Sequence, residues 1–235
     1  MSAKSDPNPE LQAVRERYGR RARHDQRYSL LNGAALHAQQ ERQRAMLRLL
    51  HHFGMTDLGF IDLVEVGSGD GDNLLEWLRF GCSPERLCGI ELLPERHAAA
   101  RARLPAAVRL ILGDATTAPI EPLAFSIVLA STVFSSLLDD AFQQRLADAM
   151  WRWVKPGGGV LWYDFTVNNP GNADVRGMPL KRVRELFPQG KMQAQRITLA
   201  PPIARRVAAV HPSLYTLFNA VPVLRTHVLA WIAKS

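Results

Sequence analysis

Apolar runs of strand length alternate with segments of helical periodicity through the middle of the chain. The runs are rich in Leu, Ile and Val, which is typical of strands buried on both faces. The segments between them repeat apolar side chains three or four positions apart, as one face of a helix does. The predicted strands are residues 58–67, 86–92, 107–115, 123–131 and 160–165. The predicted helices between them are residues 72–80, 94–104 and 141–154.

The boundaries of these helices carry local signals. Pro94 suits the first turn of the second helix, and the Lys-Pro-Gly-Gly-Gly run at 155–159 ends the third. Asp139 or Asp140 can cap the third helix with its carboxylate. Strands that alternate with helices in this way indicate a parallel sheet with helices on both faces, which is an α/β fold.

Polar side chains follow the predicted strands at the point where each strand ends. They are residues 65–71, Glu91, Asp114, Ser131 and Asp164. Because the carboxyl ends of parallel strands lie at one edge of the sheet, ligands of such sheets bind there. We therefore expect these side chains to meet in one crevice.

Composition favours a single domain in a reducing compartment. The chain has 235 residues, of which 47% are hydrophobic, enough for one well-buried core. Only two cysteines occur, Cys82 and Cys88, so we expect reduced thiols rather than a disulfide framework. The N-terminus lacks a signal-like apolar stretch, and no run of about 18 apolar residues occurs. We expect a soluble, cytoplasmic protein.

Charge is unevenly distributed along the chain. Residues 1–52 carry 10 Lys/Arg and 5 Asp/Glu, residues 53–175 carry 9 and 16, and residues 176–235 carry 10 and 1. The acidic middle suits a neutral or cationic ligand, whereas the basic ends could attract an anionic partner. The alternative is that the basic side chains are simply solvated on helices.

The stretch "VEVGSGDGDN" at residues 64–73 places three glycines between the first strand and the first helix. A dinucleotide fingerprint needs G-x-G-x-x-G, but position 72 is Asp, and acidic side chains would lie where the pyrophosphate binds. The spacing is instead E-x-G-x-G-x-G over residues 65–71. With this motif, residues 55–165 resemble the class I S-adenosylmethionine-dependent methyltransferases.

The resemblance implies a Rossmann-like, doubly wound α/β fold. Its seven-stranded sheet would be mostly parallel with the last strand antiparallel, and residues 191–200 and 225–233 would be the final strands. Residues 1–52 would form a helical N-terminal cap and residues 53–165 the cofactor-binding core. Residues 166–235 would add a substrate lip, a helical lid and the final strands to the same domain.

S-adenosylmethionine is the cofactor that the resemblance implies. The glycine loop would approach its methionine and ribose, and Glu91 would accept hydrogen bonds from both ribose hydroxyls, since a carboxylate offers two acceptor oxygens. Asp114 would accept from the adenine amino group, and Glu65 would face the ammonium group. The predicted cofactor-binding residues are Glu65, Gly67, Ser68, Gly69, Gly71, Asn73, Glu91, Leu92, Asp114, Ala115, Ser131 and Thr132.

Catalysis requires alignment of a nucleophile and transfer of one proton, because the methyl group of a sulfonium is already activated. Asp164 is the first candidate for a base or a substrate-orienting residue, with loop capping as its structural alternative. His211 is the second candidate base. The histidines lack a spacing such as H-E-x-x-H, so we expect no metal, with a carboxylate-held divalent ion as the alternative.

Two segments are candidates for holding the acceptor. The Asn-rich segment 166–177 suits a substrate lip at the catalytic edge. After the basic amphipathic stretch 179–190, the insertion 201–223 is longer than a hairpin needs and suits a lid. The predicted substrate-contacting residues are Tyr28, Asn168, Asn169, Arg176 and Tyr215.

The leading hypothesis for the acceptor is a hydroxyl of a small molecule or of a glycan or lipid-linked compound, which can be anionic. It rests on the polar lip, on the basic and partly apolar lid, and on the absence of the N-P-P-Y signature of amino-group methyltransferases after the fourth strand, where the chain reads "STVFSS". One alternative is RNA methylation, motivated by the basic ends, although no RNA-binding module is legible. The other is a cofactor-binding protein without catalysis. The sequence leaves the oligomeric state open.

Overall fold

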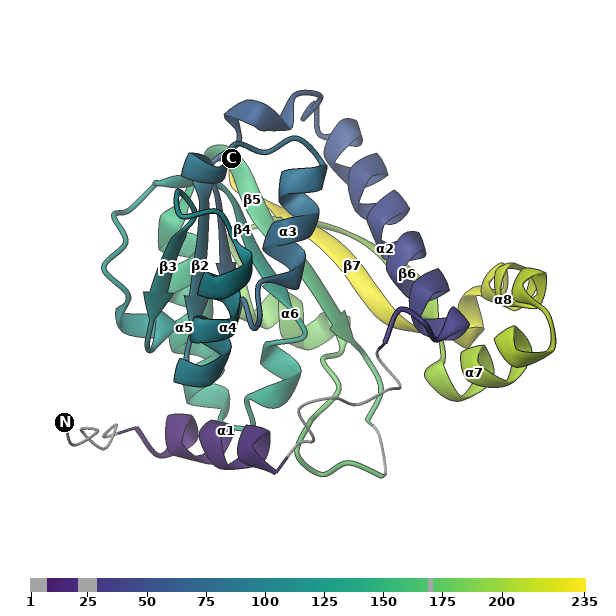
Figure 1. Cartoon of the computed structure of the whole chain (residues 1–235). Helices are drawn as coiled ribbons and strands as arrows, with labels where there is room; N and C mark the ends of the chain where they lie inside the picture. Colours follow the sequence, from purple (N-terminus) through teal and green to yellow (C-terminus); the bar gives the residue numbers. More distant parts are fainter. Residues whose placement is uncertain (1–7, 21–28, 169–170) are drawn as a thin grey trace.

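The computed structural model describes residues 8–20, 29–168 and 171–235 (Figure 1). The described residues form a seven-stranded sheet with the order β3-β2-β1-β4-β5-β7-β6. The strands are β1 (Leu63–Val66), β2 (Leu87–Glu91), β3 (Arg109–Leu112), β4 (Phe125–Ser131), β5 (Val154–Phe165), β6 (Lys191–Leu199) and β7 (Arg225–Ala233).

Strand directions confirm the predicted topology. Strands β1 to β5 pair in parallel, and β7 runs antiparallel to both of its neighbours, β5 and β6. The chain proceeds outward from β1 to β3 and then returns to β4 on the other side of β1. The order of strands therefore reverses between β1 and β4, and a ligand crevice forms at such a point beyond the carboxyl ends.

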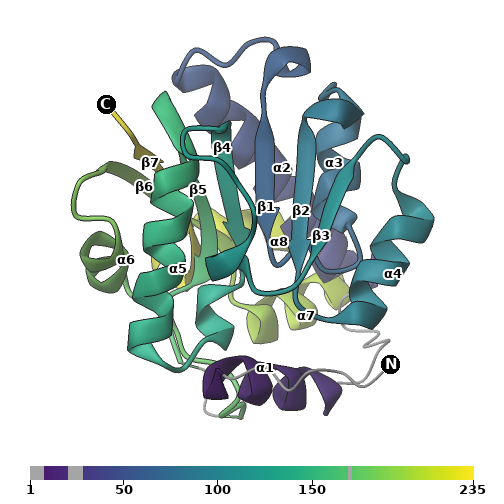
Figure 2. The ribbon, with the colours of Figure 1, turned by 90° about the vertical axis from the view of Figure 1, so that its left-hand side faces the viewer.

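Helices cover both faces of the sheet (Figure 2). One buried cluster joins α2, α3 and α4 to the sheet, and a second joins α5 and α6 to the opposite face. The helices are α2 (Gly33–His52), α3 (Asp72–Arg79), α4 (Pro94–Arg103), α5 (Asp140–Trp153) and α6 (Leu180–Leu186). As predicted, the Asp139 carboxylate caps α5 by accepting the N–H of Phe142.

The first predicted strand is too long at its start. Its first residues form a 3₁₀ turn, η2 (Leu58–Phe60), and β1 begins only at Leu63. The Asp57 carboxylate accepts the N–H of Gly59 at 2.9 Å and so stabilises this turn. Apolar content alone did not distinguish the turn from the strand that follows it.

The glycine run does more than end α5. Strand β5 starts at Val154, directly after the helix, and continues through the glycines. A Cβ at Gly158 would lie 2.5 Å from the backbone oxygen of Ser126, and one at Gly159 would lie 2.5 Å from the ring of Trp231. The glycines are therefore required for β5 to pair closely with β4 on one side and β7 on the other.

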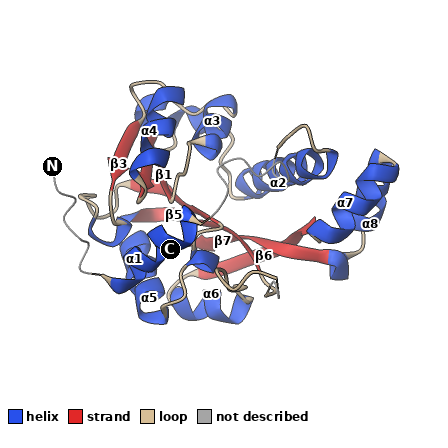
Figure 3. Cartoon of the chain, turned by 60° about the horizontal axis from the view of Figure 1, so that its bottom comes forward, coloured by secondary structure: helices blue, strands red, loops and turns tan. Residues whose placement is uncertain are grey.

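The insertion between β6 and β7 forms two helices, α7 (Pro201–Val210) and α8 (Pro212–Asn219), followed by the short turn η6 (Pro222–Leu224). We call α7 and α8 the helical pair. It packs against α2 through a small buried group that includes Ala34, Ala204 and Tyr215. Figure 3 shows the pair projecting beyond the end of the long β6 and β7 strands.

The N-terminal helix α1 (Pro9–Gly19) lies across the edge where the parallel strands end (Figure 2). Leu11 and Val14 bury their side chains in the α5-side cluster. The Glu10 carboxylate accepts the N–H of Leu138 at 2.8 Å, which fixes the helix to the segment after β4. The remaining short turns are η3 (Pro84–Arg86), η4 (Ala115–Thr117) and η5 (Phe134–Ser136).

None of the described helices combines the length and the apolar character needed to cross a bilayer. The division of the chain into an N-terminal cap (residues 1–52), a cofactor-binding core (53–165) and a C-terminal part (166–235) stays a prediction.

Candidate active site

The glycine loop joins β1 to α3 at the carboxyl edge, beside the reversal of strand order. Gly67, Gly69 and Gly71 all have positive φ, at 65°, 56° and 85°. A Cβ at Gly67 would lie 2.8 Å from the Val133 side chain, and one at Gly71 would lie 2.9 Å from Leu104. At Gly69 the nearest atom would be 3.6 Å away. Packing therefore demands the outer two glycines, whereas the central one borders space that a ligand could use.

Glu91 ties the end of β2 to this loop. Its buried carboxylate accepts the N–H of Gly69 and the N–H of Leu93, both at 2.8 Å. Leu92 lies between Glu91 and Leu93 in the sequence and is half-buried. The structure thus brings together the glycine loop and the strand-two acid, which lie 22 positions apart.

Glu65 begins a second chain of contacts, toward helix α2. Its Oε1 accepts a hydrogen bond from Asn73 at 2.5 Å, and the Asn73 amide oxygen accepts one from Arg42 at 2.8 Å. Burial raises the pKa of Glu65 to about 8. The carboxyl is therefore neutral near pH 7 unless a cation joins it.

Two buried polar atoms at this loop have no hydrogen-bond partner among the described residues, Glu65 Oε2 and Ser68 Oγ. Such atoms cost free energy unless a ligand or water completes them. A free carboxylate oxygen, a free hydroxyl and the open side of Gly69 fit a ligand with an ammonium group and hydroxyls. S-adenosylmethionine carries both.

Asp114 follows β3 at the same edge and caps the turn η4. Its two oxygens accept the N–H and the hydroxyl of Thr116, at 2.8 and 2.7 Å. Ala115 begins η4 and is half-buried. Contacts of Asp114 and Ala115 with an adenine ring stay a prediction.

Ser131 and Thr132 end β4 next to the loop. Thr132 has φ 55°, which is uncommon for a residue with a branched side chain, and its N–H donates to the Tyr163 carbonyl at 2.7 Å. Strained backbone of this kind is concentrated at ligand sites. Ser131 lines a small internal space together with Arg42, Asn73 and Tyr163.

Asp164 lies on the face of the sheet that α5 covers, opposite to the face that α2 covers. Side chains alternate along β5, so Asp164 shares the face of Trp162, which packs in the α5-side cluster. Its carboxylate accepts the N–H of Ser135 at 3.0 Å and that of Phe165 at 2.9 Å. Burial raises its pKa to about 7. These contacts are those of the capping alternative.

The lip residues are held partly within their own segment and partly by the residues that follow β4. The Asn168 amide oxygen accepts the N–H of Gly177 at 2.8 Å. The Arg176 N–H donates to the Ser135 carbonyl at 2.7 Å, and its guanidinium pairs with Asp140. Tyr28 and Asn169 lie outside the described residues, so the structure gives them no position.

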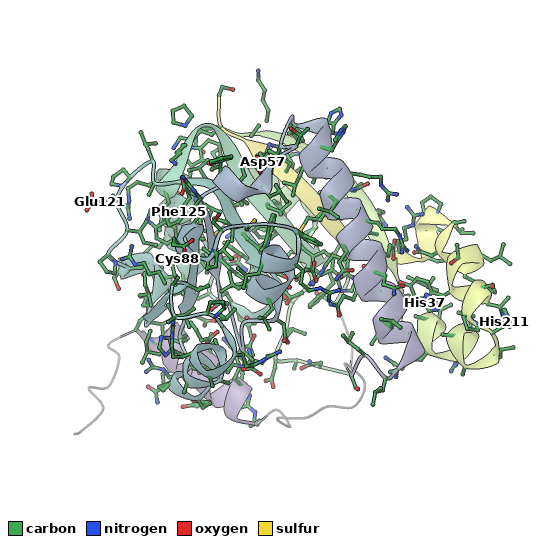
Figure 4. All side chains as sticks on the ribbon, turned by 45° about the horizontal axis from the view of Figure 1, so that its top comes forward. His37, Asp57, Cys88, Glu121, Phe125 and His211 are labelled. Atoms are coloured by element: carbon green, nitrogen blue, oxygen red, sulfur yellow. The ribbon has the colours of Figure 1, made fainter. Side chains whose placement is uncertain are left out.

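The structure does not bring His211 to the glycine loop. His211 is exposed, caps α8 by accepting the N–H of Ser213 at 3.2 Å, and lies at the outer end of the helical pair (Figure 4). Tyr215 is buried where the pair meets α2, and its hydroxyl donates to Glu41 at 3.0 Å. Its ring stacks on His37, with centroids 5.1 Å apart.

Three side chains of this region escaped the sequence analysis, Arg42, Tyr163 and His227. The rings of Tyr163 and His227 stack with centroids 5.2 Å apart, and the Arg42 guanidinium lies 5.4 Å from the Tyr163 ring. Burial lowers the pKa of His227 to about 4, and the Arg42 charge contributes. We call Glu65, Ser131, Tyr163 and His227 the polar row, since strand alternation places all four on the α2 face near the carboxyl edge.

Two of the three side chains that the sequence analysis missed had a pattern in the sequence that could have identified them. Alternation in "VLWYDF" places Tyr163 and Asp164 on opposite faces, and His227 interrupts an otherwise apolar strand. No sequence pattern identified Arg42, because its position depends on how α2 crosses the sheet.

Helix α1 lies over the part of the edge that holds the glycine loop. The Arg96 guanidinium lies 5.0 Å from the Tyr18 ring and 3.8 Å from the Asp70 carboxylate. At the same end of α1, its C-cap residue Arg20 pairs with Asp174 of the lip at 2.7 Å. The C-terminal end of α1 therefore contacts both Arg96, which pairs with the glycine loop, and the lip.

Residues 63–158 match a family model described as a methyltransferase domain. A search of curated proteins gave no match to the chain. The matched segment contains the glycine loop, Glu91, Asp114 and the end of β4.

Solved structures share the fold at low sequence identity. A putative sarcosine dimethylglycine methyltransferase from Galdieria sulphuraria is 14% identical, with a TM-score of 0.60 over 85% of this chain and 88% of that one. A SAM-dependent methyltransferase from Archaeoglobus fulgidus is 10% identical, with a TM-score of 0.57 over 84% and 98%. Phosphoethanolamine N-methyltransferase 2 of Haemonchus contortus, in complex with S-adenosyl-L-methionine, is 17% identical, with a TM-score of 0.57 over 80% and 52%.

Proposed function

Since residues 63–158 match a methyltransferase domain, we propose that this protein uses S-adenosylmethionine to methylate a hydroxyl of a small molecule or of a glycan or lipid-linked acceptor. The matched domain and the shared fold support this enzyme class and this methyl donor. The chemical nature of the acceptor is our proposal.

The observation that carries it is the position of His227 at the end of the polar row. Contacts run from the donor loop to this side chain, from Glu65 through Asn73 and Arg42 to Tyr163 and His227. His227 is half-buried rather than fully enclosed, and its lowered pKa keeps the ring unprotonated at neutral pH, the form in which a histidine can accept a proton.

Charge in this region supports a hydroxyl over an amine. Arg42 lies against Tyr163 and its charge acts on His227. An amine arrives as an ammonium ion, which the guanidinium would repel, whereas a neutral or anionic acceptor avoids that cost. The segment after β4 supports the same choice, because the Thr132 hydroxyl is engaged by the Ser131 carbonyl at 2.7 Å and no amide side chain stands there.

Bound S-adenosylmethionine supplies a methyl group activated on a sulfonium. Glu65 and Glu91 would hold its ammonium and ribose, and the residues of the polar row would orient the acceptor. The His227 ring is positioned by Tyr163 and by a 3.1 Å contact between Nδ1 and the Thr226 hydroxyl. Its Nε2 has no hydrogen bond to the described residues and would take the hydroxyl proton.

The test is transfer of labelled methyl from S-adenosylmethionine into fractionated extract of the source cells, with and without ribonuclease. We expect label in small metabolites or glycolipid, and nuclear magnetic resonance of the purified product should place the methyl on oxygen. Label on nitrogen, or label that disappears with ribonuclease, would reject the hydroxyl proposal. Donor binding without any transfer would favour a non-catalytic role.

A further inference from the structure

Large apolar side chains stand in solvent on the helical pair and the turn after it. Val210 is 77% exposed, Leu217 64% and Val223 78%. Phe218 and Val221 are exposed as well. Leu30 and Leu31, just before α2, are also exposed, and α2 packs beside the pair. Exposed apolar groups that gather in this way mark an interaction surface.

The same unit is strongly basic. Arg205 and Arg206 are exposed on α7, on the side away from its buried Ala204. Among the described residues neither arginine has an ion pair or a side-chain hydrogen bond. Residues 186–235 contain no Asp or Glu, so the charge of this surface is not compensated locally.

We propose that the helical pair docks on the surface of an anionic lipid bilayer. Aliphatic side chains would enter the interface between headgroups and acyl chains, and Arg205 and Arg206 would contact lipid phosphates. The shape fits, because the pair projects from the body of the molecule, with α2 and the end of β6 packed against its inner side (Figures 1 and 3).

The charge and the side chains of this surface argue against two other partners, a second copy of the chain and RNA. A second copy seated on the same patch would bring Arg205 and Arg206 toward their own equivalents, with no acidic side chain of residues 186–235 to offset them. RNA would accept the arginines but not aliphatic groups such as Leu217 and Val223, since single-stranded bases stack on aromatic rings. An anionic bilayer satisfies both the charge and the apolar groups.

Docking would also concern the acceptor, and this consequence rests on the proposed function. The pair follows β6 at the carboxyl edge, the edge that holds His227. A docked protein would present this edge close to the lipid surface, which suits a lipid-linked acceptor. Membrane binding itself does not depend on catalysis and is measured separately.

The experiment is flotation of the full chain with vesicles of equimolar phosphatidylcholine and phosphatidylglycerol, against vesicles of phosphatidylcholine alone. We expect binding to the anionic vesicles that weakens with salt. Arg205→Gln with Arg206→Gln should weaken it by about 20- to 30-fold, from about a fivefold loss for each charge. Val210→Ser with Leu217→Ser should weaken it by about tenfold.

Matched controls lie elsewhere on the surface. Lys181→Gln with Arg184→Gln removes two exposed charges from α6, and Phe60→Ser removes an apolar group that is 72% exposed on η2. Both should bind vesicles like the unmodified chain, and thermal unfolding confirms that each variant folds. Equal binding to neutral vesicles, or no binding to anionic ones, would overturn the proposal. So would a change of oligomeric state in the patch variants, or RNA binding that they abolish without an effect on vesicles.

Discussion

Glu65 and Glu91 are both buried acids at strand ends, but they have different hydrogen-bond partners. Glu91 accepts two backbone N–H groups, one on each carboxylate oxygen. Glu65 has one amide partner and one oxygen without a partner among the described residues, and burial raises its pKa to about 8. Each oxygen of Glu91 already has a protein partner and still has room to accept from a ribose hydroxyl, whereas the free oxygen of Glu65 would be completed by a cation.

Donor binding should therefore release a proton from Glu65. Without donor the carboxyl is protonated below about pH 8, and the donor's ammonium should stabilise the ionised form. Affinity should rise with pH up to about 8 and level off above it. Titration calorimetry at pH 7 in buffers of different ionisation enthalpy measures the release. Glu65→Gln should abolish it and Glu121→Gln should not; identical heats in all buffers for the unmodified chain would contradict the assignment.

His227 makes a separate prediction at the same scale. His227→Gln should lower kcat by about 100-fold or more, because a general base contributes about 10²–10⁴-fold. Donor affinity should be unchanged. The unmodified enzyme should keep its base active down to about pH 4, where His227 becomes protonated. His52→Gln is the exposed control, and a comparable loss in His211→Gln instead would move the base to the helical pair.

Individual site residues could be predicted from the sequence where a recognisable strand ends at an acidic residue. The meeting of Glu91 with the glycine loop followed from two apolar runs and one glycine motif. The pairing of Tyr163 with His227 could not be predicted, because it depends on β7 entering the sheet beside β5. Asp164 was singled out for its place at a strand end, but strand alternation turns it to the opposite face from Glu65.

At the scale of elements, the middle of the chain was predictable because each strand and helix has its own local pattern. The exceptions are places where contacts with other strands decide the structure. The glycine run after α5 looks like a stop signal, and only the closeness of Ser126 and Trp231 explains why it continues as β5.

Gly158→Ala tests this account of β5. The new methyl group would lie against the Ser126 carbonyl, so we expect the free energy of unfolding to fall by about 1–3 kcal/mol. Gly33→Ala, where nothing lies within 4 Å of the new methyl, should leave it nearly unchanged or slightly raised. Denaturant unfolding measures both. Equal stabilities of the two variants would show that β5 tolerates the added group.

At the scale of the molecule, the proposed donor site would join the glycine loop, the ends of β2 and β4 and the C-terminal end of α1 into one structure. A ligand that binds only this folded arrangement stabilises all of it. S-adenosylmethionine at about one hundred times its Kd should add about 2.7 kcal/mol and raise Tm by about 5–10 °C.

Gly69→Val separates this binding from folding. The position borders open space, with no atom within 3.6 Å of an added Cβ, so the side chain should block the donor more than it disturbs packing. We expect the variant to fold but to show no shift of Tm with donor. Gly54→Val, also at positive φ and away from the loop, is the control that should keep the shift. A full shift in Gly69→Val would place the donor elsewhere.

The position of β7 between β5 and β6 also bears on biosynthesis. Ribosomes deliver β6 before the strand that connects it to β5, so on the nascent chain both strands carry an edge without a hydrogen-bonded neighbour. Only when residues 225–233 emerge can β6 join the rest of the sheet. Until then the growing polypeptide exposes surfaces prone to aggregation, which makes it a natural client for chaperones.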